Sequence, residues 1–143
     1  MIIYCDTSVL VPALVPERFS NPAEDWIGVR LSGSLAISGW THTEVASALA
    51  QKQRAGAITA ERRAQAAEFW KSISGLMTLA RVEPDDFAIA AELVDAGLRG
   101  LRSGDALHLA VARRADFALA TFDRDLADAA EAVGVEVALR PPA

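Results

Sequence analysis

Short apolar runs alternate along this chain with longer stretches in which apolar residues recur every three or four positions. Runs of the first kind predict buried strands, and stretches of the second kind predict helices with one face toward a core. The predicted strands are Met1–Cys5, Ser34–Ser38, Leu76–Val82, Phe117–Thr121 and Val135–Leu139. The predicted helices are Val9–Leu14, Pro22–Leu31, Thr41–Ala55, a stretch capped by Thr59, Pro84–Leu98, a stretch beginning at Ser103 and a last one after Asp125. This alternation predicts an α/β domain with a mainly parallel central sheet.

The helix that begins at Ser103 is apolar over Ala106–Ala112, with His108 as the exception. Such a composition predicts a helix that is buried on most sides. Ser103 is suited to the N-cap and Asp105 to the first turn, where a carboxylate complements the helix dipole. The helix predicted from Pro84 also has an apolar face, made of Phe87, Ala90, Ala91, Val94 and Leu98.

Four acidic residues fall where a parallel sheet places its ligands, beyond the carboxyl ends of the strands. Asp6 directly follows the first strand, and Glu44 lies in the helix after the second strand. Asp105 lies in the first turn of the Ser103 helix, and Asp123 follows the strand after that helix. Because a carboxylate is costly to remove from water, acids at the edge of an apolar core call for a compensating cation.

The chain lacks other common arrangements of catalytic residues. It has no Gly-rich phosphate loop, no G-x-S-x-G elbow, no histidine pair at i, i+4 and no Cys–His set for zinc. Hard carboxylate oxygens remain, and these suit Mg²⁺ or Mn²⁺ in octahedral geometry. One or two such ions can activate water and stabilise the charge that develops at a phosphodiester. The residues alone therefore predict metal-dependent phosphoryl chemistry.

Composition narrows the class of protein. The chain has 143 residues, of which 52% are hydrophobic, and we expect a single domain over residues 1–143. A formal net charge of −5 argues against broad adhesion to nucleic acid, but it allows an enzyme that contacts a few phosphates through bound metal. No apolar run approaches the roughly 18 residues of a membrane span. The single cysteine, Cys5, fits a reducing compartment, so we expect a cytoplasmic protein.

Four stretches of the sequence together resemble one known family. They are IIYCDTSVL, ISGWTHTEVASAL, SGDALHLAVA and LATFDRDL. In this order and spacing they are similar to the PIN-domain ribonucleases, and above all to the VapC-type toxins of bacterial toxin–antitoxin pairs. The resemblance implies a three-layer α/β/α PIN-like domain and an endoribonuclease that cleaves RNA with water activated by Mg²⁺ or Mn²⁺. It also implies a homodimer that a small VapB-type antitoxin inhibits.

The resemblance also assigns roles to individual residues. The family's acidic quartet, which holds the metal and is catalytic, falls on Asp6, Glu44, Asp105 and Asp123. The residues expected to support the quartet are Thr7, Ser8, Thr121, Asp125 and His108. The hydroxyls of this second set would orient ligands or water, and some family members have an additional acid at the position of Asp125.

Three members of the quartet have a purely structural alternative. Asp6 could cap the first helix. Glu44 completes a capping-box pattern with Thr41, which taken locally favours a capping role. Asp105 could do no more than complement the dipole of its helix.

The remaining candidates are similarly divided. Of the two acids before the last helix, we assign the metal to Asp123 and the N-cap to Asp125. His108 could contact the acid one turn before it or the substrate, or it could be a core histidine. Arg99 and Arg102 could hold RNA phosphates or an antitoxin carboxylate, or lie in a solvated loop. The alternative function is a non-catalytic PIN-like binding or regulatory module.

Overall fold

Five parallel strands form the centre of the computed structural model, which describes residues 1–143. They are β1 (Ile3–Cys5), β2 (Leu35–Ser38), β3 (Thr78–Ala80), β4 (Ala118–Ala120) and β5 (Val137–Leu139). Their order across the sheet is β3–β2–β1–β4–β5, and every neighbouring pair is parallel. The prediction of an α/β fold with a parallel sheet is confirmed.

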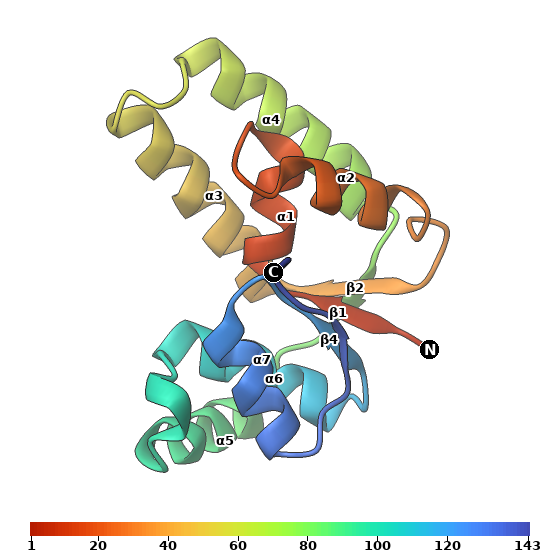
Figure 1. Cartoon of the computed structure of the whole chain (residues 1–143), viewed down its shortest axis with the longest axis vertical. Helices are drawn as coiled ribbons and strands as arrows, with labels where there is room; N and C mark the ends of the chain where they lie inside the picture. Colours follow the sequence, from red (N-terminus) through yellow and green to blue (C-terminus); the bar gives the residue numbers. More distant parts are fainter.

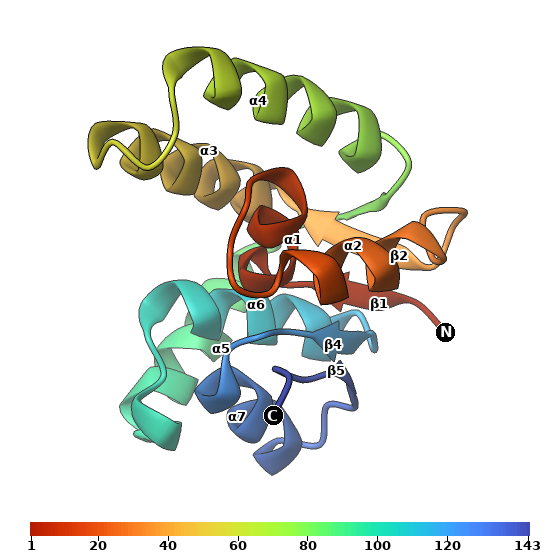
Figure 2. The same ribbon diagram turned by 45° about the horizontal axis from the view of Figure 1, so that its top comes forward.

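Helices cover both faces of this sheet, so the molecule has three layers (Figure 1). The helices on one side are α1 (Thr7–Leu14), α2 (Ser20–Gly28), α3 (Gly39–Arg54) and α4 (Ala60–Ser74). Those on the other side are α5 (Pro84–Asp95), the short η1 (Leu98–Gly100), α6 (Ser103–Arg114) and α7 (Arg124–Ala132). Figure 2 shows the same division from a second direction. No helix combines the length and the apolar character that crossing a bilayer requires.

The alternation of side chains along β1 divides the core between the two faces of the sheet. Ile3 and Cys5 belong to an apolar cluster with residues of α1, α2, α3 and α4. Tyr4 points the other way and belongs to a second cluster with residues of α5, α6 and α7. As predicted, α6 is buried on most sides, since every residue of Ala106–Ala112 is buried.

The strands are shorter than their apolar runs. The run Leu76–Val82 contributes only the three residues of β3, and Thr78 and Leu79 are exposed because β3 lies at an edge of the sheet. An edge strand pairs with one neighbour only and buries only one face. Its apolar run can therefore be longer than the part that is hydrogen-bonded in the sheet.

The helix caps were predicted with mixed success. Thr59 caps α4 as predicted. Ser103 is the first residue of α6 and not its cap, since Arg102 holds the N-cap position without a side-chain bond. The helix predicted from Thr41 begins two residues earlier, because Thr41 and Ser38 form its capping box.

The apolar face predicted for α5 is wrong in part. The buried residues of α5 are Asp86, Ala90 and Leu93. Phe87 is 59% exposed and Val94 is 39% exposed. These two side chains border a groove of about 820 Å³ whose lining is mostly apolar.

An ion pair explains this orientation of α5. Asp86 is fully buried and accepts hydrogen bonds from Nε and Nη2 of Arg114 on α6, at 2.7 and 3.1 Å. The same carboxylate accepts from the backbone N–H of Glu83 at 2.7 Å. Because a buried carboxylate requires its partners, the side of α5 that carries Asp86 faces α6.

Candidate metal centre

The carboxyl ends of β2, β1 and β4 lie next to one another, and the chain places an acid after each. Asp6 follows β1, Glu44 lies in the second turn of the helix after β2, and Asp123 lies three residues beyond β4. Asp105, in the first turn of α6, is close enough to feel the charges of the other three. The structure therefore brings the four predicted acids to the side of the sheet where the central strands have their carboxyl ends. Their role as metal ligands stays a prediction.

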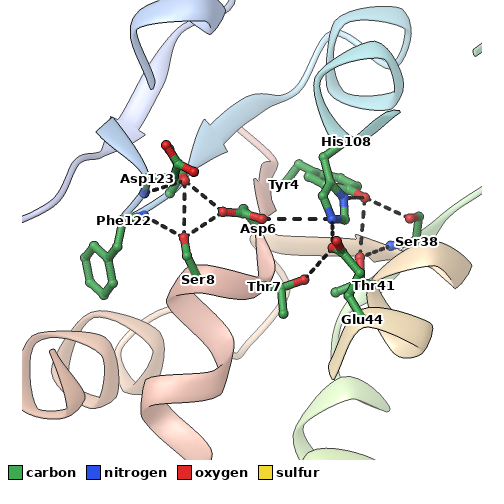
Figure 3. A network of polar contacts seen from close by, with 11 residues as sticks. Tyr4, Asp6, Thr7, Ser8, Ser38, Thr41, Glu44, His108, Phe122 and Asp123 are labelled. Atoms are coloured by element: carbon green, nitrogen blue, oxygen red, sulfur yellow. Dashed lines mark hydrogen bonds and ion pairs between the residues drawn. The ribbon is translucent and has the colours of Figure 1, made fainter. Parts of the chain in front are cut away.

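Asp6 is the most buried of these acids, with 4% of its surface exposed. It occupies the N-cap position of α1, but its side chain does not cap the helix, so the structural alternative for Asp6 is wrong. Instead its Oδ2 accepts hydrogen bonds from the hydroxyls of Ser8 and Thr121, at 2.6 and 2.8 Å (Figure 3). Its Oδ1 lies 3.9 Å from Nε2 of His108. Hydroxyl donors thus fix the orientation of this carboxylate.

Glu44 reaches from α3 toward both α1 and α6. Its Oε1 accepts a hydrogen bond from the Thr7 hydroxyl at 2.8 Å and contacts Nε2 of His108. Burial acts to raise the pKa of Glu44, but the interactions with His108 and Thr7 outweigh it, so the net pKa is lowered. The capping alternative for Glu44 is wrong, because the capping box of α3 uses Ser38 and Thr41.

His108 is fully buried, and its ring links the acids to a set of hydroxyl groups on the other side. Its Nδ1 lies 2.6 Å from the hydroxyl of Tyr4, which lies 2.8 Å from Oγ of Ser38 and 3.3 Å from Oγ1 of Thr41. Burial strongly raises the pKa of Tyr4, so this side chain remains a neutral phenol. His108 is therefore a core histidine, as one of the two interpretations of the sequence had it, and the acids it contacts are Asp6 and Glu44, whereas the sequence predicted the acid one turn before it, Asp105.

Tyr4 is a residue of this site that the sequence patterns did not single out. The spacing of Tyr4 from Asp6 could have identified it as a residue of the site. The two are two residues apart in extended chain, so their side chains point to the same side. On α6, Asp105 and His108 are three residues apart and share one side of the helix. Since a histidine buried in an apolar helix needs a hydrogen-bond partner, a tyrosine facing it from β1 was the natural candidate.

Asp105 carries a charge that the protein does not compensate. Burial is the largest effect that raises the pKa of Asp105, and the negative charges of Asp6 and Asp123 add to it. Glu44 contributes less, and His108 acts in the opposite direction. The resulting pKa of Asp105 is about 6, against an ordinary value of 3.8. A carboxyl shifted in this way favours a nearby cation.

The two acids at the start of α7 exchange the structural role assigned to them. Asp123 is the N-cap, and its Oδ1 accepts from the backbone N–H of Leu126 at 3.1 Å. Asp125 is exposed in the first turn of the same helix. The prediction that Asp125 caps this helix is therefore wrong. An acid at N-cap also satisfies the backbone, which is why spacing alone could not decide between the two residues.

The site differs from the other buried carboxylate of the fold in its lack of a counterion. Asp86 has the guanidinium of Arg114, whereas the only basic side chain within ion-pair distance of Asp6 or Glu44 is His108. One ligand atom from each of Asp6, Glu44 and His108 lies within 4.8 Å of the others. Uncompensated, closely spaced carboxylate oxygens are the donor set that a divalent cation such as Mg²⁺ or Mn²⁺ requires, so the residues fit the metal.

A glycine on α6 gives Glu44 the room that it occupies. A Cβ atom on Gly104 would lie 3.0 Å from Oε2 of Glu44 and 3.4 Å from Cζ2 of Trp40. The contact with Glu44 is tighter than ordinary van der Waals contact, so a side chain here would displace the Glu44 carboxylate by a few tenths of an ångström, whereas 3.4 Å from Trp40 is ordinary contact. Position 104 therefore favours glycine, because the side chain of Glu44 on α3 comes close to α6 there.

Arg99 and Arg102 are exposed on the segment that leads into α6. Arg99 has a φ of 51°, in the left-handed region that favours glycine, and lies between Gly97 and Gly100 with φ of 69° and 66°. A non-glycine residue in this region costs about 1 kcal/mol or more. The segment presents both guanidinium groups to solvent near the start of α6, and what they contact stays a prediction.

Comparison with a family model identifies the class of protein. The PIN domain model matches residues 3–132, so this chain belongs to the PIN domain family. The family resemblance seen in the sequence is confirmed, and the three-layer fold is consistent with it.

Three solved structures give the same fold. PAE2754 from Pyrobaculum aerophilum is 23% identical, over 98% of this chain and 83% of that one, with a TM-score of 0.71. FitAcB from Neisseria gonorrhoeae is 20% identical, over 95% and 96%, with a TM-score of 0.73. Mycobacterium tuberculosis VapC20 (Rv2549c), a Sarcin-Ricin loop cleaving toxin, is 22% identical, over 93% and 95%, with a TM-score of 0.70. A comparison with curated proteins finds no match.

Proposed function

We propose that this chain, as one PIN domain over residues 1–143, is a VapC-type toxin. It is a cytoplasmic endoribonuclease that hydrolyses RNA phosphodiester bonds with Mg²⁺ or Mn²⁺. The observation that carries this proposal is the set of clustered carboxylates, one of them only 4% exposed, that no lysine or arginine balances. Membership in the PIN family and the fold shared with VapC20 support RNA as the substrate.

The four acids form the metal centre in this proposal. Asp6 and Glu44 have ligand atoms within 4.8 Å of each other, and Asp105 lies close enough for the charges of Asp6, Asp123 and Glu44 to act on it. When bound, the ion supplies an activated water for attack on the phosphorus and stabilises the charge that develops on the phosphate. The acids themselves hold the ion and keep its position fixed relative to the RNA backbone.

The hydroxyl side chains keep the acids in a binding geometry. Ser8 and Thr121 both donate to Oδ2 of Asp6, and Thr7 donates to Oε1 of Glu44. Each bond fixes a carboxylate rotamer before the ion arrives, so less side-chain order has to be created on binding. We therefore assign the three hydroxyls a positioning role.

Replacement of Asp6 by asparagine tests the proposal. The amide keeps the shape of the side chain but removes the negative charge, so we expect RNA cleavage to be lost while circular dichroism shows an unchanged fold. The matched control is Asp25→Asn, which changes an exposed acid on α2 and is expected to cleave at the wild-type rate. EDTA should abolish wild-type cleavage, and Mg²⁺ or Mn²⁺ should restore it. Cleavage by Asp6→Asn, or in EDTA, would contradict the proposal, and absence of any cleavage would favour a non-catalytic binding module.

The proposal includes a VapB-type antitoxin as partner. Arg99 and Arg102 are exposed on the segment that leads into α6, the helix of Asp105, and a guanidinium there can pair with an RNA phosphate or with an antitoxin carboxylate. The double variant Arg99→Ala/Arg102→Ala is expected to bind RNA or antitoxin more weakly and to bind Mn²⁺ as the wild type does. Unchanged affinity for both macromolecules would remove these residues from the proposed interface.

We include a homodimer in the proposal. The exposed Phe87 and Val94 border the apolar groove on α5, and an exposed apolar surface of this kind is typical of protein–protein contact. A wild-type dimer and a monomeric Phe87→Asp variant are the expected results of size-exclusion chromatography with light scattering. A monomeric wild type would contradict the homodimer without affecting the metal centre.

A further inference from the structure

His108 occupies a position from which it can bind the same ion as the acids. Its Nε2 lies 3.9 Å from Oδ1 of Asp6 and contacts Oε1 of Glu44. Ligand atoms that share an ion at about 2.1 Å lie about 3.0 Å apart when adjacent and about 4.2 Å apart when opposite. The 3.9 Å separation from Asp6 lies between those two values, so small side-chain shifts would let one ion contact all three residues.

We propose that His108 is a direct ligand through Nε2, so that the centre combines carboxylate oxygens with one imidazole nitrogen. The inference rests on the proposed function, because it concerns the same ion. In Figure 3 the ring of His108 lies between Tyr4 on one side and Asp6 and Glu44 on the other. No basic side chain other than His108 is in reach of these two acids, so nothing else competes for the position.

The contact between His108 and Glu44 indicates which proton has to leave before Nε2 can bind an ion. A carboxylate only accepts hydrogen bonds, so contact with Glu44 requires the proton of His108 to be on Nε2. An ion that binds Nε2 displaces that proton to solvent, and in the metal-bound ring Nδ1 carries the only proton.

Tyr4 can accommodate both tautomers. Its oxygen lies 2.6 Å from Nδ1 of His108, so its O–H can donate to Nδ1 whenever that nitrogen carries no proton. When Nδ1 carries the proton, the Tyr4 oxygen accepts a hydrogen bond from Nδ1–H. The Tyr4 O–H then turns to Oγ of Ser38, at 2.8 Å. A metal-bound histidine normally donates its other N–H to such an acceptor, which fixes the orientation of the ring. Tyr4 is therefore a positioning residue for the metal ligand.

The nitrogen ligand has a consequence for the choice of ion. Mg²⁺ prefers oxygen ligands alone, whereas first-row transition ions accept imidazole readily. We therefore expect the centre to bind Mn²⁺ more tightly than Mg²⁺. Replacing His108 by asparagine should reduce this preference about tenfold or more, since the variant loses the one donor that distinguishes the two ions.

Pulsed electron paramagnetic resonance of the Mn²⁺-loaded protein tests the assignment without any activity measurement. The chain has two histidines, and His42 is exposed on α3 with Trp70 as its hydrogen-bond partner. With ¹⁵N-labelled histidine, we expect a directly coordinated nitrogen in the wild type and in His42→Asn, and none in His108→Asn. Tyr4→Phe should keep the nitrogen signal and bind Mn²⁺ about tenfold more weakly.

The outcomes separate this inference from the proposed function. Mn²⁺ that binds in an Asp6-dependent manner but shows no histidine nitrogen would overturn the inference and leave the acidic metal centre in place. Absence of Mn²⁺ binding would overturn both. If His108→Asn does not fold, the wild type and His42→Asn decide the question, because a nitrogen signal that survives loss of His42 can come only from His108.

Discussion

Replacing Asp105 by asparagine is expected to stabilise the metal-free protein at neutral pH. Burial, together with the charges of Asp6 and Asp123, raises the pKa of Asp105 to about 6 from 3.8, so the folded chain binds a proton more tightly here than the unfolded chain does. The contribution of Asp105 to stability therefore falls as pH rises from about 4 to about 6 and is constant above that window. Asparagine resembles the protonated acid, so the Asp105→Asn protein does not lose this contribution to stability as pH rises.

The size of the effect follows from the same shift. A pKa change from 3.8 to about 6 corresponds to about 3 kcal/mol at most. Because Asp105 is only partly buried, solvent screens part of this energy, and about 1 to 2 kcal/mol is expected. For a chain of 143 residues that is a rise of about 3 to 7 °C in Tm.

Urea unfolding in EDTA at several pH values measures this difference directly. Asp105→Asn should gain stability over the wild type at pH 7.5 and lose that advantage near pH 4. Asp25→Asn, at an exposed site, should match the wild type at both values. Saturating Mn²⁺ should reverse the order at pH 7.5, because only the wild type gains the full binding energy. An Asp105→Asn protein that is less stable than the wild type in EDTA at pH 7.5 would refute the electrostatic reasoning.

Two further substitutions test the surroundings of the site. Gly104→Ala should weaken Mn²⁺ binding in calorimetry, because its Cβ would lie 3.0 Å from Oε2 of Glu44. The free energy of unfolding should change by less than about 1 kcal/mol, since alanine favours the helix. Unchanged binding would show that Glu44 moves freely. Arg114→Ala should cost about 3 kcal/mol in urea unfolding, because it leaves the buried Asp86 without its guanidinium, and a cost below about 1 kcal/mol would contradict that account.

The sequence was sufficient to predict the order of the elements and the gathering of four acids. This worked because each strand is a separate apolar run and because parallel strands place their carboxyl ends at one edge. It also located α6 as the buried helix, since an apolar stretch such as Ala106–Ala112 has no other stable position in a folded domain.

The contacts between elements could not be predicted, because they depend on how helices rotate against each other. The side of α5 that faces the core is set by the pair of Asp86 with Arg114, which are 28 residues apart. The network of Tyr4 with Ser38 and His108 likewise joins β1, β2 and α6. Local patterns carry no information on such pairs until the strand order is known.

The structure also indicates how a fold can support a cluster of acids that repel one another. Stability comes from elsewhere, namely from the two apolar clusters on opposite faces of the sheet and from the Asp86–Arg114 pair that holds α5 against α6. Because α6 carries both Asp105 and His108, this pair fixes one side of the site while the acids remain uncompensated. An ion present at a free concentration of about 100 times its Kd would then add about 2.7 kcal/mol to the free energy of unfolding. Folding and ion binding are therefore linked through the same charges that the proposed nuclease uses.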